Sequence, residues 1–107
     1  NLIVAGTNAK DMFEAAQELI RVQGGYTLVR EGKVVDTLPL PICGLMSDAP
    51  AEELITRLDE ITEKAWAMGV PRDIDAYITL SFMALPVIPK LRVTDMGVFD
   101  SENFKFL

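Results

Sequence analysis

The sequence predicts an α+β fold in which a mostly antiparallel sheet carries two main helices packed on it. Two segments place apolar residues at helical spacing between recognisable start and stop signals. Between them, two β-rich runs are joined by the turn-forming pair Glu31-Gly32. The predicted order is therefore β-α-β-β-α, followed by a mixed tail that ends in short strands. A length of 107 residues predicts a single domain, residues 1–107.

The N-terminal third is expected to form a strand and then a helix. The all-apolar run Leu2–Gly6 predicts a short buried strand. Thr7-Asn8 then offers a helix N-cap, and Gly24-Gly25 ends the helix because glycine accepts a left-handed conformation at little cost. The apolar stripe between these signals comprises Met12, Ala15, Ala16, Leu19 and Val22.

The next segment is expected to form the hairpin. Its strands are Tyr26–Arg30 and Lys33–Leu38. Pro39 and Pro41 lack a backbone N–H, so strand pairing should stop or move to an edge there. After a loop at 44–48, either Ser47 or Asp48 is expected to cap the second helix, with Pro50 in its first turn.

The second helix has the clearest pattern in the chain, and Gly69 and Pro71 should end it. Acid–base pairs at i,i+4, Glu53 with Arg57 and Glu60 with Lys64, are expected on its exposed side. Its apolar face comprises Leu54, Leu58, Ile61, Ala65 and Met68.

The tail is densely apolar from Thr79 to Phe99, although Pro86 and Pro89 interrupt it. Surface loops are usually polar, so this run should be buried against something. Periodicity leaves Tyr77–Leu85 open between a short helix and a buried strand. Leu91–Thr94 and Val98–Asp100 are expected to form a final pair of strands around a turn at Met96-Gly97.

Three blocks of sequence carry a family resemblance: NLIVAGTN at residues 1–8, LPLPICGLMSDAPAEEL at 38–54 and TLSFMALPVIPKLRVTDMGVF at 79–99. Together they resemble the C-terminal domain of bacterial adenine deaminases, metal-dependent hydrolases of the amidohydrolase superfamily. The blocks follow the family's order and span nearly the whole chain. The resemblance implies an accessory domain of an enzyme that converts adenine to hypoxanthine and ammonia. It also implies that the parent's barrel domain is the partner and holds a binuclear manganese or iron centre.

Composition limits the possible partners and compartment. The net charge of −6 argues against nucleic acid and anionic membranes, whose binding depends on basic residues. A single cysteine excludes an internal disulfide and is compatible with a cytoplasmic location. No apolar run is long enough to span a bilayer. Because the chain opens on Asn1 and immediately turns apolar, it is expected to be a piece of a longer protein.

The absence of histidine is the main argument about chemistry. Hydrolytic deamination of a purine needs an activated water and a group that transfers protons to the departing ammonia. Amidohydrolases hold the metals that activate this water with several histidines and carboxylates. No position in this chain matches those ligands. We therefore expect no catalytic residue, no metal site and no deaminase activity in these 107 residues.

The remaining reactive side chains have simpler interpretations. Three carboxylates at the start of the second helix are expected to cap it and to interact favourably with its dipole: Asp48, Glu52 and Glu53. Two loop carboxylates, Asp73 and Asp75, are expected to be solvated. Cys43 lies between apolar neighbours and is expected to be a small buried hydrophobe, not a nucleophile. A phosphate site at the Gly6–Asn8 turn lacks the spaced glycines and lysine of known motifs.

Two segments combine apolar side chains with a hydroxyl and remain candidates for a surface that docks on the parent's barrel or lines the mouth of its active site. The alternative for both is core packing with a helix cap. The candidate residues are Gly44, Leu45, Met46 and Ser47 in the first segment, and Ser81, Phe82 and Met83 in the second. Docking through the tail would also use Leu85, Val87 and Ile88.

Two other functional classes stay open. The β-α-β-β-α order is similar to that of ACT-type domains, which bind small regulatory ligands at subunit interfaces. Alternatively, an exposed apolar patch would pair with itself in a homo-oligomer.

Overall fold

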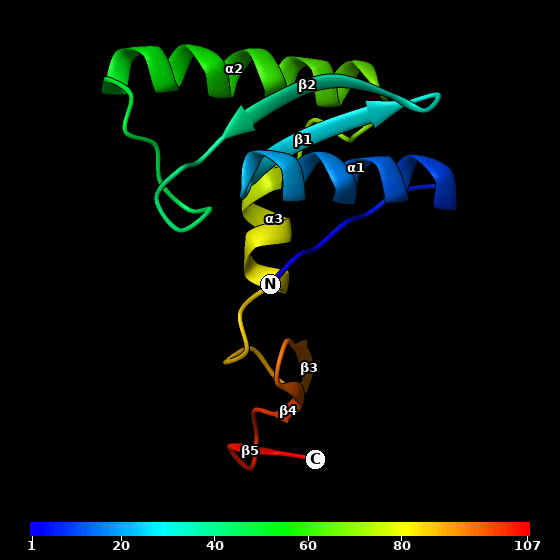
Figure 1. Cartoon of the computed structure of the whole chain (residues 1–107), viewed down its shortest axis with the longest axis vertical. Coiled ribbons are helices and arrows are strands. Elements are labelled where there is room, and N and C mark those ends of the chain that lie inside the picture. The colour runs from blue at the N-terminus through cyan, green and yellow to red at the C-terminus, as the bar shows by residue number, and fades with distance from the viewer. The chain divides into compact units, whose positions relative to one another are not determined.

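The computed structural model describes all residues 1–107, and the chain divides into two compact units. The helix–hairpin unit is Val4–Ala76, and the tail unit is Asn1–Ile3 with Tyr77–Leu107. The fold class is α+β, as predicted, with three helices and two antiparallel sheets (Figure 1). The two sheets replace the single sheet that was expected. The prediction of one domain stays a prediction.

The helix–hairpin unit places a two-stranded sheet between two helices (Figure 1). Strands β1 (Gly25–Arg30) and β2 (Lys33–Pro39) pair antiparallel, and the register shifts between Leu28 and Val29, where β2 carries one extra residue, Val35. The predicted turn is confirmed, because Glu31 and Gly32 both have positive φ. The strand ladder ends at Pro39, where pairing was expected to stop.

Helix α1 (Ala9–Val22) begins where the sequence predicted. The side chain of Asn8 caps it by accepting a hydrogen bond from the Asp11 N–H at 2.9 Å. At the other end, the left-handed residue at the cap is Gln23, at φ 64°, and not one of the glycines. The expected glycine cap was therefore one residue late, because Gln23 already turns the chain and lets the Gly24 N–H reach the Leu19 carbonyl.

Helix α2 (Ala51–Ala67) carries the predicted apolar face, and Ile61 and Ala65 on that face are buried. Two details differ from prediction. Pro50 occupies the N-cap and no side chain caps the helix. The Ser47 hydroxyl instead accepts a hydrogen bond from the Ala49 N–H, which closes a local turn.

The expected strand at Leu2–Gly6 is wrong, because this segment has no regular secondary structure. A strand is stable only when a neighbour pairs with its backbone, and no strand pairs with these residues. An apolar run alone does not reveal whether such a neighbour exists.

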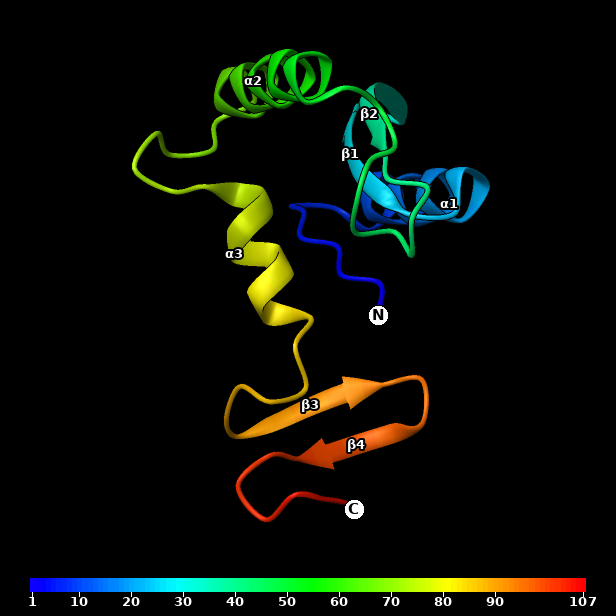
Figure 2. The same ribbon diagram turned by 90° about the vertical axis from the view of Figure 1, so that its left-hand side faces the viewer.

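The tail unit contains a short helix and a three-stranded sheet. Helix α3 (Ala76–Met83) settles the ambiguous segment as helical. Strands β3 (Leu91–Thr94), β4 (Gly97–Asp100) and β5 (Lys105–Phe106) form an antiparallel meander in the order β3-β4-β5. Figure 2 shows β3 and β4 side by side, which confirms the predicted strand pair. No helix of the structure is both long and apolar enough to cross a bilayer.

Candidate docking surface and polar network

The first candidate segment forms a tight turn that projects apolar side chains. Ile42 and Met46 form an isolated antiparallel bridge, and their backbones exchange two hydrogen bonds of 3.1 Å. Leu45 and Met46 are exposed, with 73% and 58% of their surface accessible to solvent. Gly44 lies within the turn, and the Ser47 hydroxyl oxygen accepts a hydrogen bond from the Ala49 N–H. The turn therefore presents thioether and aliphatic surface.

Cys43 is exposed, contrary to the expectation that it is buried. Its φ of 58° places it in the left-handed region, at the tip of this turn. The prediction took the apolar neighbours of Cys43 as a sign of burial, but Ile42 and Leu45 are exposed as well.

The second candidate segment lies on α3. Phe82 and Met83 are largely exposed there, while the Ser81 hydroxyl donates to the Tyr77 carbonyl at 2.8 Å. Such a bond to the preceding turn is common for serine in helices. Leu85 and Val87 beyond the helix are also exposed. The structure thus gives the tail unit an apolar surface.

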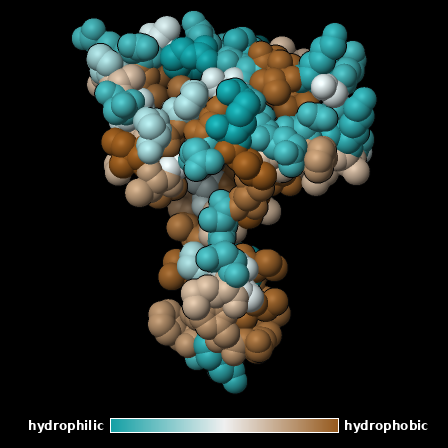
Figure 3. Space-filling view, in the orientation of Figure 1, coloured by the Kyte–Doolittle hydropathy of each residue, from teal (hydrophilic) through white to brown (hydrophobic).

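The meander of the tail unit adds an aromatic cluster that the sequence reasoning missed. The ring of Phe99 meets those of Phe104 and Phe106 edge-on, with centroids 5.3 and 5.1 Å apart. A groove of about 230 Å³ lies beside them and is also lined by Val87 and Met96. In the space-filling view, hydrophobic residues cover much of the visible face of this unit (Figure 3). Phe99 lies opposite Phe106 on the neighbouring strand, and this pairing cannot be read from the sequence without the strand register.

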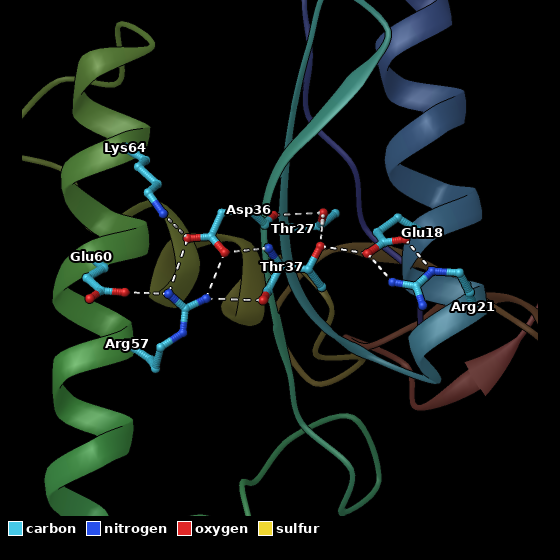
Figure 4. Close-up of polar contacts among 8 residues, drawn as sticks. All are labelled: Glu18, Arg21, Thr27, Asp36, Thr37, Arg57, Glu60 and Lys64. Carbon is cyan, nitrogen blue, oxygen red and sulfur yellow. Dashed lines mark hydrogen bonds and ion pairs between the residues drawn. The ribbon is translucent and has the colours of Figure 1, made fainter.

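A polar network crosses the helix–hairpin unit from α1 to α2 (Figure 4). On one side, the carboxylate of Asp36 accepts hydrogen bonds from Arg57 at 2.7 Å and from Lys64 at 2.5 Å. On the other side, the Thr37 hydroxyl donates to Glu18 at 2.8 Å. Neighbouring residues on a strand point to opposite faces, so Asp36 and Thr37 show that the two helices cover opposite faces of the hairpin.

These contacts correct the predicted acid–base pairs of α2. Arg57 pairs with Asp36 and Glu60, and Lys64 pairs with Asp36. The predicted i,i+4 pairs, with Glu53 and Glu60 as acids, do not form, because the basic groups turn toward a largely buried carboxylate on the sheet. Asp36 offered one signal in the sequence: it is an acid in the middle of a β-rich run.

Two carboxylates of the network, Glu18 and Asp36, have a lowered pKa that favours the ionised form. Hydrogen bonds from Arg21, and then from Thr37, lower the pKa of Glu18 to about 2. Burial raises the pKa of Asp36, but hydrogen bonds from Arg57 and Lys64 outweigh that effect and leave it below its ordinary value. A carboxylate whose pKa is lowered is a poor proton carrier near neutral pH. The network therefore joins the helices to the sheet and is unsuited to acid–base catalysis.

No group of three or more metal-ligating side chains is arranged to hold a metal ion. Asp48, Glu52, Glu53, Asp73 and Asp75 are all exposed. The residues of this chain thus do not fit a binuclear metal centre.

Comparison with known proteins identifies the family of this chain. Residues 1–105 match the family described as the adenine deaminase C-terminal domain. The chain belongs to this family. It is 48% identical to an adenine deaminase of Desulfitobacterium hafniense (strain Y51) over 107 residues, which are 100% of this chain and 19% of that protein. An adenine deaminase of Clostridium acetobutylicum is 47% identical over 108 residues, again 100% of this chain and 19% of the relative.

A third adenine deaminase, from Halalkalibacterium halodurans, is 42% identical over 107 residues, which are 100% of this chain and 18% of that protein. This adenine deaminase C-terminal domain therefore spans about a fifth of the length of the curated relatives it matches.

Proposed function

We propose that this domain is a non-catalytic part of an adenine deaminase, the enzyme that converts adenine and water to hypoxanthine and ammonia. The observation that carries the proposal is the family match over residues 1–105 together with the small share of each relative that the chain covers. Chemistry supports the same division, because the chain has no histidine and no cluster of metal ligands. Activation of the attacking water then belongs to another part of the enzyme, which we expect to hold binuclear manganese or iron.

The domain's role is to dock on that catalytic part, a metal-bearing barrel, and brace it. Exposed apolar side chains of both units support docking, since large apolar patches on soluble proteins usually mark interaction sites. Each unit offers its own proposed surface. In the helix–hairpin unit it comprises Gly44, Leu45, Met46 and Ser47, and in the tail unit it comprises Ser81, Phe82, Met83, Leu85, Val87 and Ile88. A cytoplasmic location and a homo-oligomeric parent enzyme remain predictions.

Exchange of domains tests this proposal. In the D. hafniense relative, the segment that matches this chain would be replaced by these 107 residues, and deamination of adenine would be followed by ammonia release. We expect the chimera to be folded and active, whereas the relative with the segment deleted loses activity or solubility. Full activity and solubility of the deleted enzyme would contradict a bracing role.

A small-molecule regulatory module is the second candidate. Only the predicted order β-α-β-β-α favoured this function, and the first strand of that order is absent from the structure. Calorimetric titration of the chain with purines and amino acids separates the two functions: binding would favour regulation, and its absence would favour docking.

A further inference from the structure

The turn Ile42–Met46, here called the knob, is closed by its own backbone. The Ile42 and Met46 backbones each donate to the other's carbonyl at 3.1 Å, and the Leu45 N–H also reaches the Ile42 carbonyl at 3.0 Å. The two residues at the tip, Cys43 and Gly44, both have positive φ, at 58° and 71°. A cysteine rarely adopts this conformation, so the surrounding structure must impose it.

The knob is fixed to the end of α1 by a close approach of two glycines. A Cβ atom added to Gly24 would lie 2.6 Å from the Cα of Gly44, so only glycine allows the two backbones to touch. Beside this contact, the Leu40 N–H donates to the Gly24 carbonyl at 3.1 Å. The knob is therefore held in one conformation before any partner arrives.

This rigid turn presents apolar side chains to solvent. Leu45 is the more exposed of its two main apolar groups, and Met46 follows it, with Ile42 at the base. Rigid apolar groups lose little conformational freedom on binding, which makes them effective anchors. The Leu45 side chain is largely exposed and therefore packs little against the rest of the unit.

Charge narrows the choice of partner. The helix–hairpin unit has 13 acidic and seven basic residues and thus carries the whole net charge of −6, while the tail unit has three of each. Asp48, Glu52 and Glu53 follow the knob in the sequence and are exposed. A second copy would bring like charges together at this surface, which disfavours self-association through the knob.

We propose that the knob enters an apolar pocket rimmed by basic residues on the remainder of the adenine deaminase polypeptide. Leu45 and Met46 fill the pocket, Gly44 and Gly24 hold the turn, and the nearby acids face the basic rim. Four-fifths of each curated relative lies outside the segment that this chain matches, which leaves ample surface for such a pocket. This inference rests on the proposed function and names the contact that carries it.

The single cysteine of the chain offers a direct probe. N-ethylmaleimide would be added to the isolated chain and to the D. hafniense chimera, and modification of the peptide that contains Cys43 would be followed by mass spectrometry. We expect modification in the chimera to be at least tenfold slower, because the partner covers the knob. Equal rates in a folded, active chimera would overturn the inference and leave the proposed function intact. An inactive, unfolded chimera that also fails to protect Cys43 would overturn both.

Variants test the anchors themselves. The double substitution Leu45→Asp and Met46→Asp should return the rate in the chimera to that of the isolated chain. Phe13→Asp, at another exposed apolar position of the same unit, should leave Cys43 protected. Leu45→Ser with Met46→Ser gives a milder version should the aspartates unfold the chain. Continued protection in a folded anchor variant would contradict the inference.

Two further measurements test the partner's chemistry. The double substitution Glu52→Lys and Glu53→Lys should speed modification of Cys43 in the chimera, because it would repel a basic rim. Asp73→Lys should leave the rate unchanged. Equal effects of the two variants would contradict a basic rim. Slower modification of the isolated chain at higher protein concentration would show that a second copy occupies the knob, and would contradict the inference.

Discussion

The guanidinium of Arg57 on α2 lies 2.7 Å from the carboxylate of Asp36 on β2, and that carboxylate also accepts the ammonium of Lys64. Asp36 is only 10% exposed, so it is the least accessible member of the cluster. A largely buried carboxylate with two cationic partners joins the helix to the sheet firmly, because removal of its charge would leave both partners without their shared acceptor.

Replacement of Asp36 by asparagine should therefore destabilise the helix–hairpin unit. We expect a loss of about 2 kcal/mol in the free energy of unfolding, measured by urea titration. Asp59→Asn, at an exposed position of α2, should change that free energy by less than about 0.5 kcal/mol. Equal effects of the two substitutions would show that the cluster contributes no more than an ordinary surface charge.

The low pKa of Glu18 predicts acid sensitivity. A group whose pKa falls from 4.5 in the unfolded chain to about 2 in the folded chain stabilises the fold above pH 4.5, and this contribution disappears as the pH falls toward 2. Its partner Arg21 is largely exposed, so solvent limits the effect to about 1 kcal/mol. Unfolding free energies at several pH values between 6 and 2 should thus fall more steeply for the wild type than for Glu18→Gln. Parallel curves would contradict this account.

The contact between Gly24 and Gly44 predicts a strong position-specific effect. Gly24→Ala should reduce the free energy of unfolding by about 3 kcal/mol, because its Cβ would overlap the Gly44 backbone and because φ is +113°. Gly69→Ala is the matched control: its φ of +106° is similar, but nothing lies within 4 Å of the added carbon. It should lose only about 1 kcal/mol. A comparable loss at both positions would remove the evidence for close packing at Gly24.

The aromatic cluster predicts local stability in the tail unit. Phe99→Ala removes the ring that meets both Phe104 and Phe106, so amide hydrogen exchange in β3, β4 and β5 should become faster. Val93→Ala on β3, where the side chain is exposed, serves as the control and should leave those rates nearly unchanged. Unaltered exchange in the Phe99 variant would show that the ring contacts do not hold the meander together.

The sequence predicted those elements that depend on local chemistry. Asn8 caps α1 because its side chain needs only the N–H of Asp11, three residues away. Likewise, Glu31-Gly32 forms the turn between β1 and β2 from the conformational freedom of two residues. Such signals are complete within a few positions of the chain.

Features that depend on distant partners were missed or misassigned. Arg57 had an acid one helical turn away in Glu53, but it pairs with Asp36, 21 residues distant in the sequence. Leu2–Gly6 had the composition of a strand without a neighbour to pair with. Among the candidate site residues, Leu45 and Met46 were identified from their apolar character, while the backbone geometry that exposes them could not be derived from residue types.

The central claim is that catalysis resides outside these 107 residues, and ammonia release tests it most directly. The purified chain would be supplied with adenine and Mn²⁺ or Fe²⁺, beside the intact D. hafniense adenine deaminase as a positive control. We predict ammonia from the control and none above background from the chain. Sustained turnover by the chain alone, proportional to its concentration, would contradict the account.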